Sequence, residues 1–119
     1  MDILVVDDSA VMRMMVVRTL RQAGFDASSI TQASDGAEAF DIVCKSEPDL
    51  ILSDWNMPNM NGIEFLEKLR DDNISCTFGF ITTESTGEMR KRAAEAGAKF
   101  LISKPFTVEA FQQVKDAYF

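Results

Sequence analysis

Five short apolar runs alternate along the chain with five segments that have helical periodicity. The runs are rich in Ile, Leu, Val and Phe, which is typical of strands buried on both faces of a sheet. They are Ile3–Val6, Ile30–Ala33, Leu50–Ser53, Phe78–Thr82 and Phe100–Ser103. Strict alternation of strands and helices predicts an α/β fold, with a five-stranded parallel sheet and helices on both of its faces.

Capping residues and apolar stripes define the five helical segments. Two of the segments begin with Asp or Asn followed by Glu three residues later, which is the pattern of a capping box. These pairs are Asp35 with Glu38, and Asn61 with Glu64. The expected inward faces of the first and last helices are Met12, Met15, Val16, Leu20 and Ala23, and Val108, Phe111, Val114 and Tyr118. The fourth segment, about Thr86–Ala96, has Met89 as its one large apolar residue, so we expect it to bury little surface.

Charge and composition exclude several classes of function. The formal net charge of −7, from 12 basic and 19 acidic residues, disfavours direct binding to nucleic acid. The absence of histidine excludes His-based triads, His metal sites and a phosphohistidine on this chain. Cys44 and Cys76 are in no CxxC pair, so we expect reduced thiols.

The chain has no apolar run of about 20 residues and no basic, cleavable leader, so we expect a cytoplasmic protein without a membrane span. No linker or repeat divides the sequence, and we expect one domain over residues 1–119.

Polar side chains follow four of the five expected strands. They are Asp7-Asp8, Asp54, Thr82-Thr83 and Lys104-Pro105. The second strand is followed only by Ser34-Asp35-Gly36, which the helix start explains. In a sheet with the flavodoxin-like order 2-1-3-4-5, the second strand lies at an edge and the carboxyl ends of the other four lie together. We therefore expect these side chains to form one crevice.

Each of these residues also has an ordinary structural explanation. Asp8 or Ser9 could cap the first helix, Thr82 could be a strand residue, and Lys104 could be a solvated charge. The segment 56–62 could be a turn-rich loop. Capping alone does not explain why polar groups follow four of the strands, whereas the second strand is followed only by the residues of a helix start.

Electrostatics indicates what such a crevice would hold. Three neighbouring carboxylates repel one another unless a cation is present. Ligands that are all oxygen favour a hard ion such as Mg²⁺, which commonly uses one or two carboxylates with waters and a phosphate oxygen. Lys104 could balance the charge of a phosphoryl group and Thr82 could donate a hydrogen bond to it. Asp54, on the central strand, is the best candidate for a nucleophile.

These elements resemble the signature of receiver domains from two-component response regulators, over essentially the whole chain. Asp54–Gly62 and Lys104–Thr107 resemble chemotaxis receivers of the CheY type more specifically. The resemblance implies that Asp54 is the phosphoacceptor, with Thr82 and Lys104 contacting the phosphoryl group. It implies that Mg²⁺ is bound directly by Asp8, Asp54 and the backbone carbonyl of Asn56, and through water by Asp7.

The resemblance also implies a cis Lys104–Pro105 bond and an influence of Asn56 and Glu84 on a short-lived phosphoryl state. Two positions depart from the chemotaxis pattern. Leu101 occupies the place of the family's switch aromatic, and strand alternation directs the neighbouring Phe100 to the opposite face. Thr83 stands where those receivers have a smaller residue, so we expect it to restrict access of water.

The leading hypothesis is a stand-alone, monomeric signalling switch that receives its phosphoryl group from a sensor histidine kinase. Its partner surface would be the fourth helix, fifth strand and fifth helix, and its target would be a flagellar motor switch protein or another protein. A single-domain phosphorelay shuttle is the nearest alternative.

Three other classes fit the residues less well. A Mg²⁺-dependent phosphatase with an Asp nucleophile, of the haloacid dehalogenase type, would need a second acid where Asn56 stands. A flavin-binding module would need a phosphate loop where Asp7-Asp8 would repel phosphate. A binding module that has lost phosphorylation would not need the complete set of polar residues.

Overall fold

The computed structural model describes residues 1–26, 29–83 and 85–119. Its five strands form one sheet in the order β2-β1-β3-β4-β5, and every neighbouring pair is parallel. The strands are β1 Asp2–Val6, β2 Ser29–Ala33, β3 Leu50–Ser53, β4 Thr77–Thr82 and β5 Phe100–Ser103. The predicted flavodoxin-like α/β fold is confirmed, including the edge position of β2.

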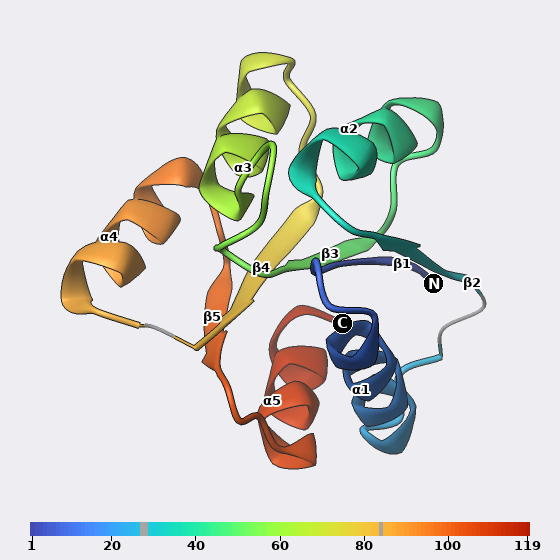
Figure 1. Cartoon of the computed structure of the whole chain (residues 1–119). Helices are drawn as coiled ribbons and strands as arrows, with labels where there is room; N and C mark the ends of the chain where they lie inside the picture. Colours follow the sequence, from blue (N-terminus) through green and yellow to red (C-terminus); the bar gives the residue numbers. More distant parts are fainter. Residues whose placement is uncertain (27–28, 84) are drawn as a thin grey trace.

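Five helices cover the two faces of the sheet (Figure 1). They are α1 Ala10–Gln22, α2 Gly36–Lys45, α3 Gly62–Asp71, α4 Gly87–Ala96 and α5 Val108–Tyr118. Helices α1 and α5 lie on one face, and α2, α3 and α4 lie on the other. None of the helices in the described part of the chain has the length and apolar character that a membrane span requires.

The predicted helix starts are correct, although only one capping box is complete. At α3, Asn61 and Glu64 satisfy each other's backbone N–H groups. At α2, the Asp35 carboxylate accepts a hydrogen bond from the Glu38 backbone N–H, but the Glu38 side chain accepts one from the Ser34 hydroxyl. Both arrangements fix the loops that lead from β2 and β3 into their helices.

Two hydrophobic cores lie on opposite faces of the sheet, because side chains alternate along each strand. Leu4 and Val6 of β1 face the core beneath α2, α3 and α4, whereas Ile3 and Val5 face the core beneath α1 and α5. These four side chains are each 1% exposed, so the first strand ties the two cores together.

The inward faces of α1 and α5 are narrower than their sequences predicted. Met15 is 49% exposed, although the next residue, Val16, is buried, and it lines a hollow of about 260 Å³ beside Lys104 and Pro105. Tyr118 is 42% exposed, because it stacks on Phe100 at the edge of the sheet and donates a hydrogen bond to the Lys99 carbonyl.

Helix α4 is held mainly at its C-terminal end. Ala93 is its one buried residue, which agrees with the expectation that this polar helix buries little. Arg70, from α3, donates hydrogen bonds to the carbonyls of Ala96, Gly97 and Ile74 at 3.1, 2.9 and 3.2 Å. The bonds to Ala96 and Gly97 fasten the end of α4 to α3 through main-chain atoms.

Candidate functional site

Three carboxylates meet at the carboxyl edge of the sheet. Asp7 and Asp8 follow β1 and Asp54 follows β3, and the register of these strands pairs Val6 with Ser53. Each acid offers an oxygen within 4.8 Å of the others. The sheet therefore brings together the acids that the sequence placed at separate strand ends.

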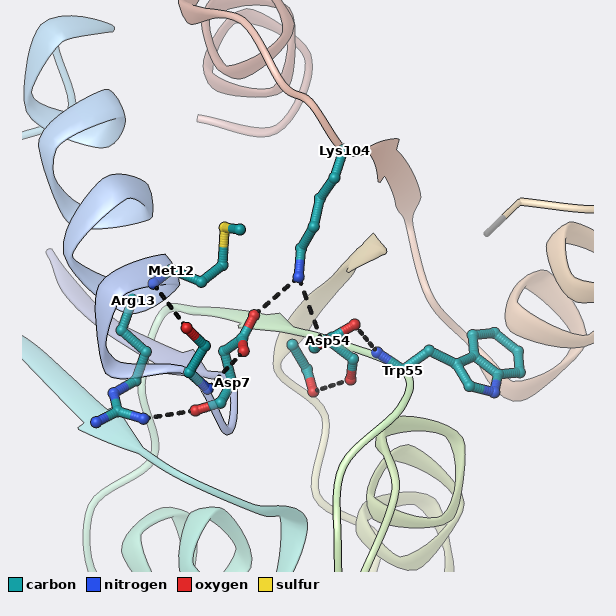
Figure 2. Close-up of polar contacts among 8 residues, drawn as sticks. Asp7, Met12, Arg13, Asp54, Trp55 and Lys104 are labelled. Carbon is teal, nitrogen blue, oxygen red and sulfur yellow. Dashed lines mark hydrogen bonds and ion pairs between the residues drawn. The ribbon is translucent and has the colours of Figure 1, made fainter. Parts of the chain in front are cut away.

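An ammonium group joins two of these carboxylates (Figure 2). The Nζ atom of Lys104 donates to Asp7 Oδ2 at 2.9 Å and to Asp54 Oδ2 at 3.3 Å. The three side chains are only 6–12% exposed, so these ion pairs are screened far less than surface pairs. Lys104 follows β5 and precedes a cis peptide bond to Pro105.

The carboxylate of Asp54 is fixed on its other side by the main chain. Its Oδ1 atom accepts a hydrogen bond from the Trp55 backbone N–H at 2.7 Å. Burial raises the pKa of Asp54, and the nearby charge of Asp7 raises it further, although Lys104 opposes both effects. A carboxylate that is poorly solvated yet held in one orientation is suited to attack an electrophile or to bind a cation.

A buried hydroxyl without a partner lies at the end of β4, the strand next to β3. Thr82 is 0% exposed, and its Oγ1 atom has no hydrogen-bond partner among the described residues. Such groups are rare in folded proteins, because an unpaired hydroxyl costs free energy. The strand order places this donor on the same side of Asp54 as Lys104, where an incoming anionic group could satisfy it.

The remaining predicted residues surround this cluster. The side chains of Asn56 and Thr83 are exposed, and Glu84 lies outside the described residues. Leu101 packs with the core beneath α2, α3 and α4, whereas Phe100 packs with the core beneath α1 and α5. The two side chains therefore lie on opposite faces of the sheet, as alternation predicted.

One polar residue next to the acids was not predicted. Arg13 of α1 donates from Nη1 to the backbone carbonyl of Asp7 at 2.6 Å (Figure 2) and from Nε to Gln32 Oε1 at 3.0 Å. No sequence pattern marks a side chain that binds a main-chain carbonyl. The sequence around Arg13 is apolar, with Met12 and Met14 on either side, and gave no sign of the contact.

The donor chemistry of the cluster fits a hard divalent cation. All candidate ligands are oxygen atoms, two of the acids are partly or wholly accessible, and the described residues supply no histidine or cysteine to this edge. A cation would also relieve the repulsion among three carboxylates that share a single ammonium.

A family model for the response regulator receiver domain matches residues 3–115. The chain belongs to the response regulator receiver family. The receiver is 37% identical over 121 residues to chemotaxis protein CheY-3 of Vibrio cholerae, covering 100% of this chain and 92% of that protein.

Solved structures give the same picture. The structure of chemotaxis protein CheY4 of Vibrio cholerae has a TM-score of 0.86 and 33% identity, covering 99% of this receiver and 98% of that chain. The CheX–CheY–BeF₃–Mg²⁺ complex of Borrelia burgdorferi has a TM-score of 0.87 and 25% identity, covering 99% of this receiver and 89% of that chain. Acidic clusters like that of Asp7, Asp8 and Asp54 are typical of the Mg²⁺ sites of receivers.

Proposed function

We propose that this receiver is a phosphorylation switch in which Asp54 accepts a phosphoryl group from a phosphohistidine of a sensor kinase. The observation that carries the proposal is the composition of one buried cluster. A lysine ammonium contacts two carboxylates there, and a hydroxyl that has no partner among the described residues lies at the neighbouring strand end. The cluster thus combines a nucleophile, a cation and a free donor in the way that phosphoryl transfer requires.

The chemistry follows from these groups. An oxygen of Asp54 forms a bond to phosphorus while the bond from phosphorus to the donor nitrogen breaks, and its electron pair returns to the imidazole. The ammonium of Lys104 exchanges its contact with Asp54 for one with the phosphoryl group, and the hydroxyl of Thr82 donates to the same group. Both contacts stabilise charge next to the side chains of Lys104 and Asp54, which are only 9% and 12% exposed.

The metal site is proposed from the same cluster. Asp8, Asp54 and the backbone carbonyl of Asn56 would hold Mg²⁺ directly, and Asp7 would act through a bound water. Mg²⁺ supplies charge neutralisation for the acids and for the transferring group. In the structure Asp8 is the most exposed of the three acids, which suits a ligand that a hydrated ion meets first.

The output is proposed to be binding of a protein partner through the surface of α4, β5 and α5. A groove of about 380 Å³ on this surface is lined by residues of β5 and α5 and by the loop between them. The CheY relatives favour a target in chemotaxis, such as a flagellar motor switch protein, and the CheX–CheY complex is a relative bound to a protein. Leu101 lacks the ring that chemotaxis receivers have at this position, so the switch does not depend on an aromatic side chain there.

The phosphoryl state is proposed to be short-lived and the receiver to act as a cytoplasmic monomer. Asn56 and Glu84 are the residue types that chemotaxis receivers have at the positions that influence dephosphorylation. The exposed Thr83 would narrow the approach of water and slow the loss of the phosphoryl group. If the receiver is instead a phosphorelay shuttle, a histidine phosphotransfer protein, rather than water, will remove the phosphoryl group.

A direct experiment uses Trp55, the sole tryptophan of the chain, whose backbone binds Asp54. Mg²⁺ and then acetyl phosphate are added to the wild type, to Asp54→Asn and to Asp41→Asn, an exposed acid on α2 that serves as a matched control. We expect a Mg²⁺-dependent fluorescence change and a mass gain of one phosphoryl group in the wild type and in Asp41→Asn. A wild type that neither binds Mg²⁺ nor gains mass would contradict the proposal and leave a receiver that binds its partner without phosphorylation.

A further inference from the structure

Arg13 holds the main chain that carries the first two acids. Its guanidinium bridges the Asp7 carbonyl, at 2.6 Å, and the side-chain oxygen of Gln32, at 3.0 Å (Figure 2 draws the first contact). Gln32 is exposed on β2, the edge strand, and lies outside the acidic cluster. Through Arg13, a surface residue of one strand is therefore connected to the turn between β1 and α1.

The two acids of that turn are fixed in different ways. Asp7 is 4% exposed, and its carboxylate accepts hydrogen bonds from Lys104 and from the Ser9 backbone N–H. Asp8 is exposed, and its side chain has no hydrogen bond or ion pair with the described residues. Among the described residues, only the backbone therefore restrains where the Asp8 side chain starts.

The Asp7 carbonyl belongs to the peptide group that joins Asp7 to Asp8. Because Arg13 binds this carbonyl, it fixes the plane of that peptide and with it the position from which the Asp8 side chain leaves the main chain. A hydrogen bond from a charged donor at this distance is among the stronger restraints available to a loop. Residues that orient ligands in this way commonly change metal affinity when they are replaced.

We propose that Arg13 is a positioning residue for the Mg²⁺ site and that Gln32 acts as its brace. This inference rests on the proposed function, since it assigns a role toward the metal of that site. The charge of Arg13 and its positioning of the main chain have opposite effects on Mg²⁺ affinity. A nearby positive charge disfavours a bound cation, so removing it would by itself strengthen Mg²⁺ binding. If positioning dominates, the loss of Arg13 weakens binding instead.

The test is a titration of Trp55 fluorescence with Mg²⁺ for the wild type, Arg13→Gln, Gln32→Ala and the double variant. We expect Mg²⁺ affinity to fall about tenfold in Arg13→Gln and about threefold in Gln32→Ala, which changes no charge and breaks one bond of the brace. The double variant should match Arg13→Gln within about twofold, because both substitutions break the same connection. Arg21→Gln, at an exposed position in the last turn of α1, is the charge-matched control and should bind Mg²⁺ like the wild type.

Two further measurements separate positioning from a general structural role. The urea midpoint without Mg²⁺ shows whether each variant is folded, and the rate of phosphorylation by acetyl phosphate is measured at low and at saturating Mg²⁺. We expect the rate of Arg13→Gln to be reduced at low Mg²⁺ and to return to within about twofold of the wild type at saturation, since the defect lies in affinity. Unchanged or tighter Mg²⁺ binding in Arg13→Gln would overturn the inference while leaving the proposed function intact. A wild type without a Mg²⁺ response would instead overturn the proposed function.

Discussion

Replacement of Thr82 by valine should stabilise the protein and impair its chemistry at the same time. The hydroxyl of Thr82 is fully buried and has no partner among the described residues. An unpaired buried hydroxyl costs about 1–3 kcal/mol, and valine fills almost the same volume without that cost. We therefore expect the free energy of unfolding of Thr82→Val to exceed that of the wild type by about 1 kcal/mol.

Urea denaturation followed by Trp55 fluorescence, without Mg²⁺, measures this change. With an m value of about 1–2 kcal/mol/M, the urea midpoint should rise by about 0.5–1 M. Thr19→Val is the matched control, because the Thr19 hydroxyl is also sheltered but donates a hydrogen bond to the Met15 carbonyl at 2.8 Å. The same substitution there should lower the free energy of unfolding by about 0.5–1 kcal/mol.

The same substitution, Thr82→Val, should impair phosphorylation although it raises stability. A hydrogen bond to a charged group contributes about 1.5–3 kcal/mol, so losing the Thr82 donor should slow phosphorylation of Asp54 by about tenfold to a hundredfold. Phosphorylation at the wild-type rate would refute the role of Thr82 toward the phosphoryl group. A midpoint that falls in Thr82→Val as it does in Thr19→Val would refute the reasoning that its hydroxyl is unsatisfied.

Three other substitutions probe the charge and packing of the molecule. Because burial holds the pKa of Asp54 above 3.8, the folded state binds this proton more tightly than the unfolded state, and stability falls as pH rises from about 4 through the raised pKa. Asp54→Asn should therefore be more stable than the wild type at about pH 7 without Mg²⁺, and this difference should disappear towards pH 3. Urea midpoints measured across that range would show the change, and equal midpoints at every pH would contradict it. Lys104→Met leaves the carboxylates of Asp7 and Asp54 without their shared cation, so it should lower the free energy of unfolding by about 3 kcal/mol. Adding Mg²⁺ should recover part of this loss. A loss that Mg²⁺ does not reduce would argue against a metal site. In Gly79→Ala the added Cβ would overlap the ring of Phe100, so thermal unfolding should show that the free energy of unfolding falls by about 1–3 kcal/mol. Adding Phe100→Leu should restore part of this loss, and an equal loss in the double variant would point to another cause.

The fold and the acidic cluster could be predicted from the sequence because both follow from regular geometry. Strands recur with a fixed alternation of apolar residues, and parallel strands end at one edge of the sheet. Residues as distant in sequence as Asp7 and Lys104 could therefore be assigned to one place. The alternation of side chains also sufficed to put Phe100 and Leu101 on opposite faces.

Other features depend on contacts that have no regular pattern. Arg13 of α1 binds a carbonyl, an acceptor that every residue carries, and its other partner, Gln32, lies on β2. Met15 and Tyr118 have the spacing of buried residues, yet Met15 borders an open hollow and Tyr118 stays 42% exposed while it stacks on Phe100. How much of an apolar stripe is covered is set by the packing of the whole domain rather than by local periodicity.

The attachment of α4 through Arg70 has a consequence for how the receiver can change over evolution. The carbonyls that Arg70 binds belong to the main chain, so they are present whatever side chains the helix carries. Exposed positions of α4, such as Lys91 and Glu95, are thereby freed from the task of holding the helix in place. They can be exchanged at little cost in stability, so one scaffold can present different surfaces while its cluster of Asp7, Asp54 and Lys104 stays the same.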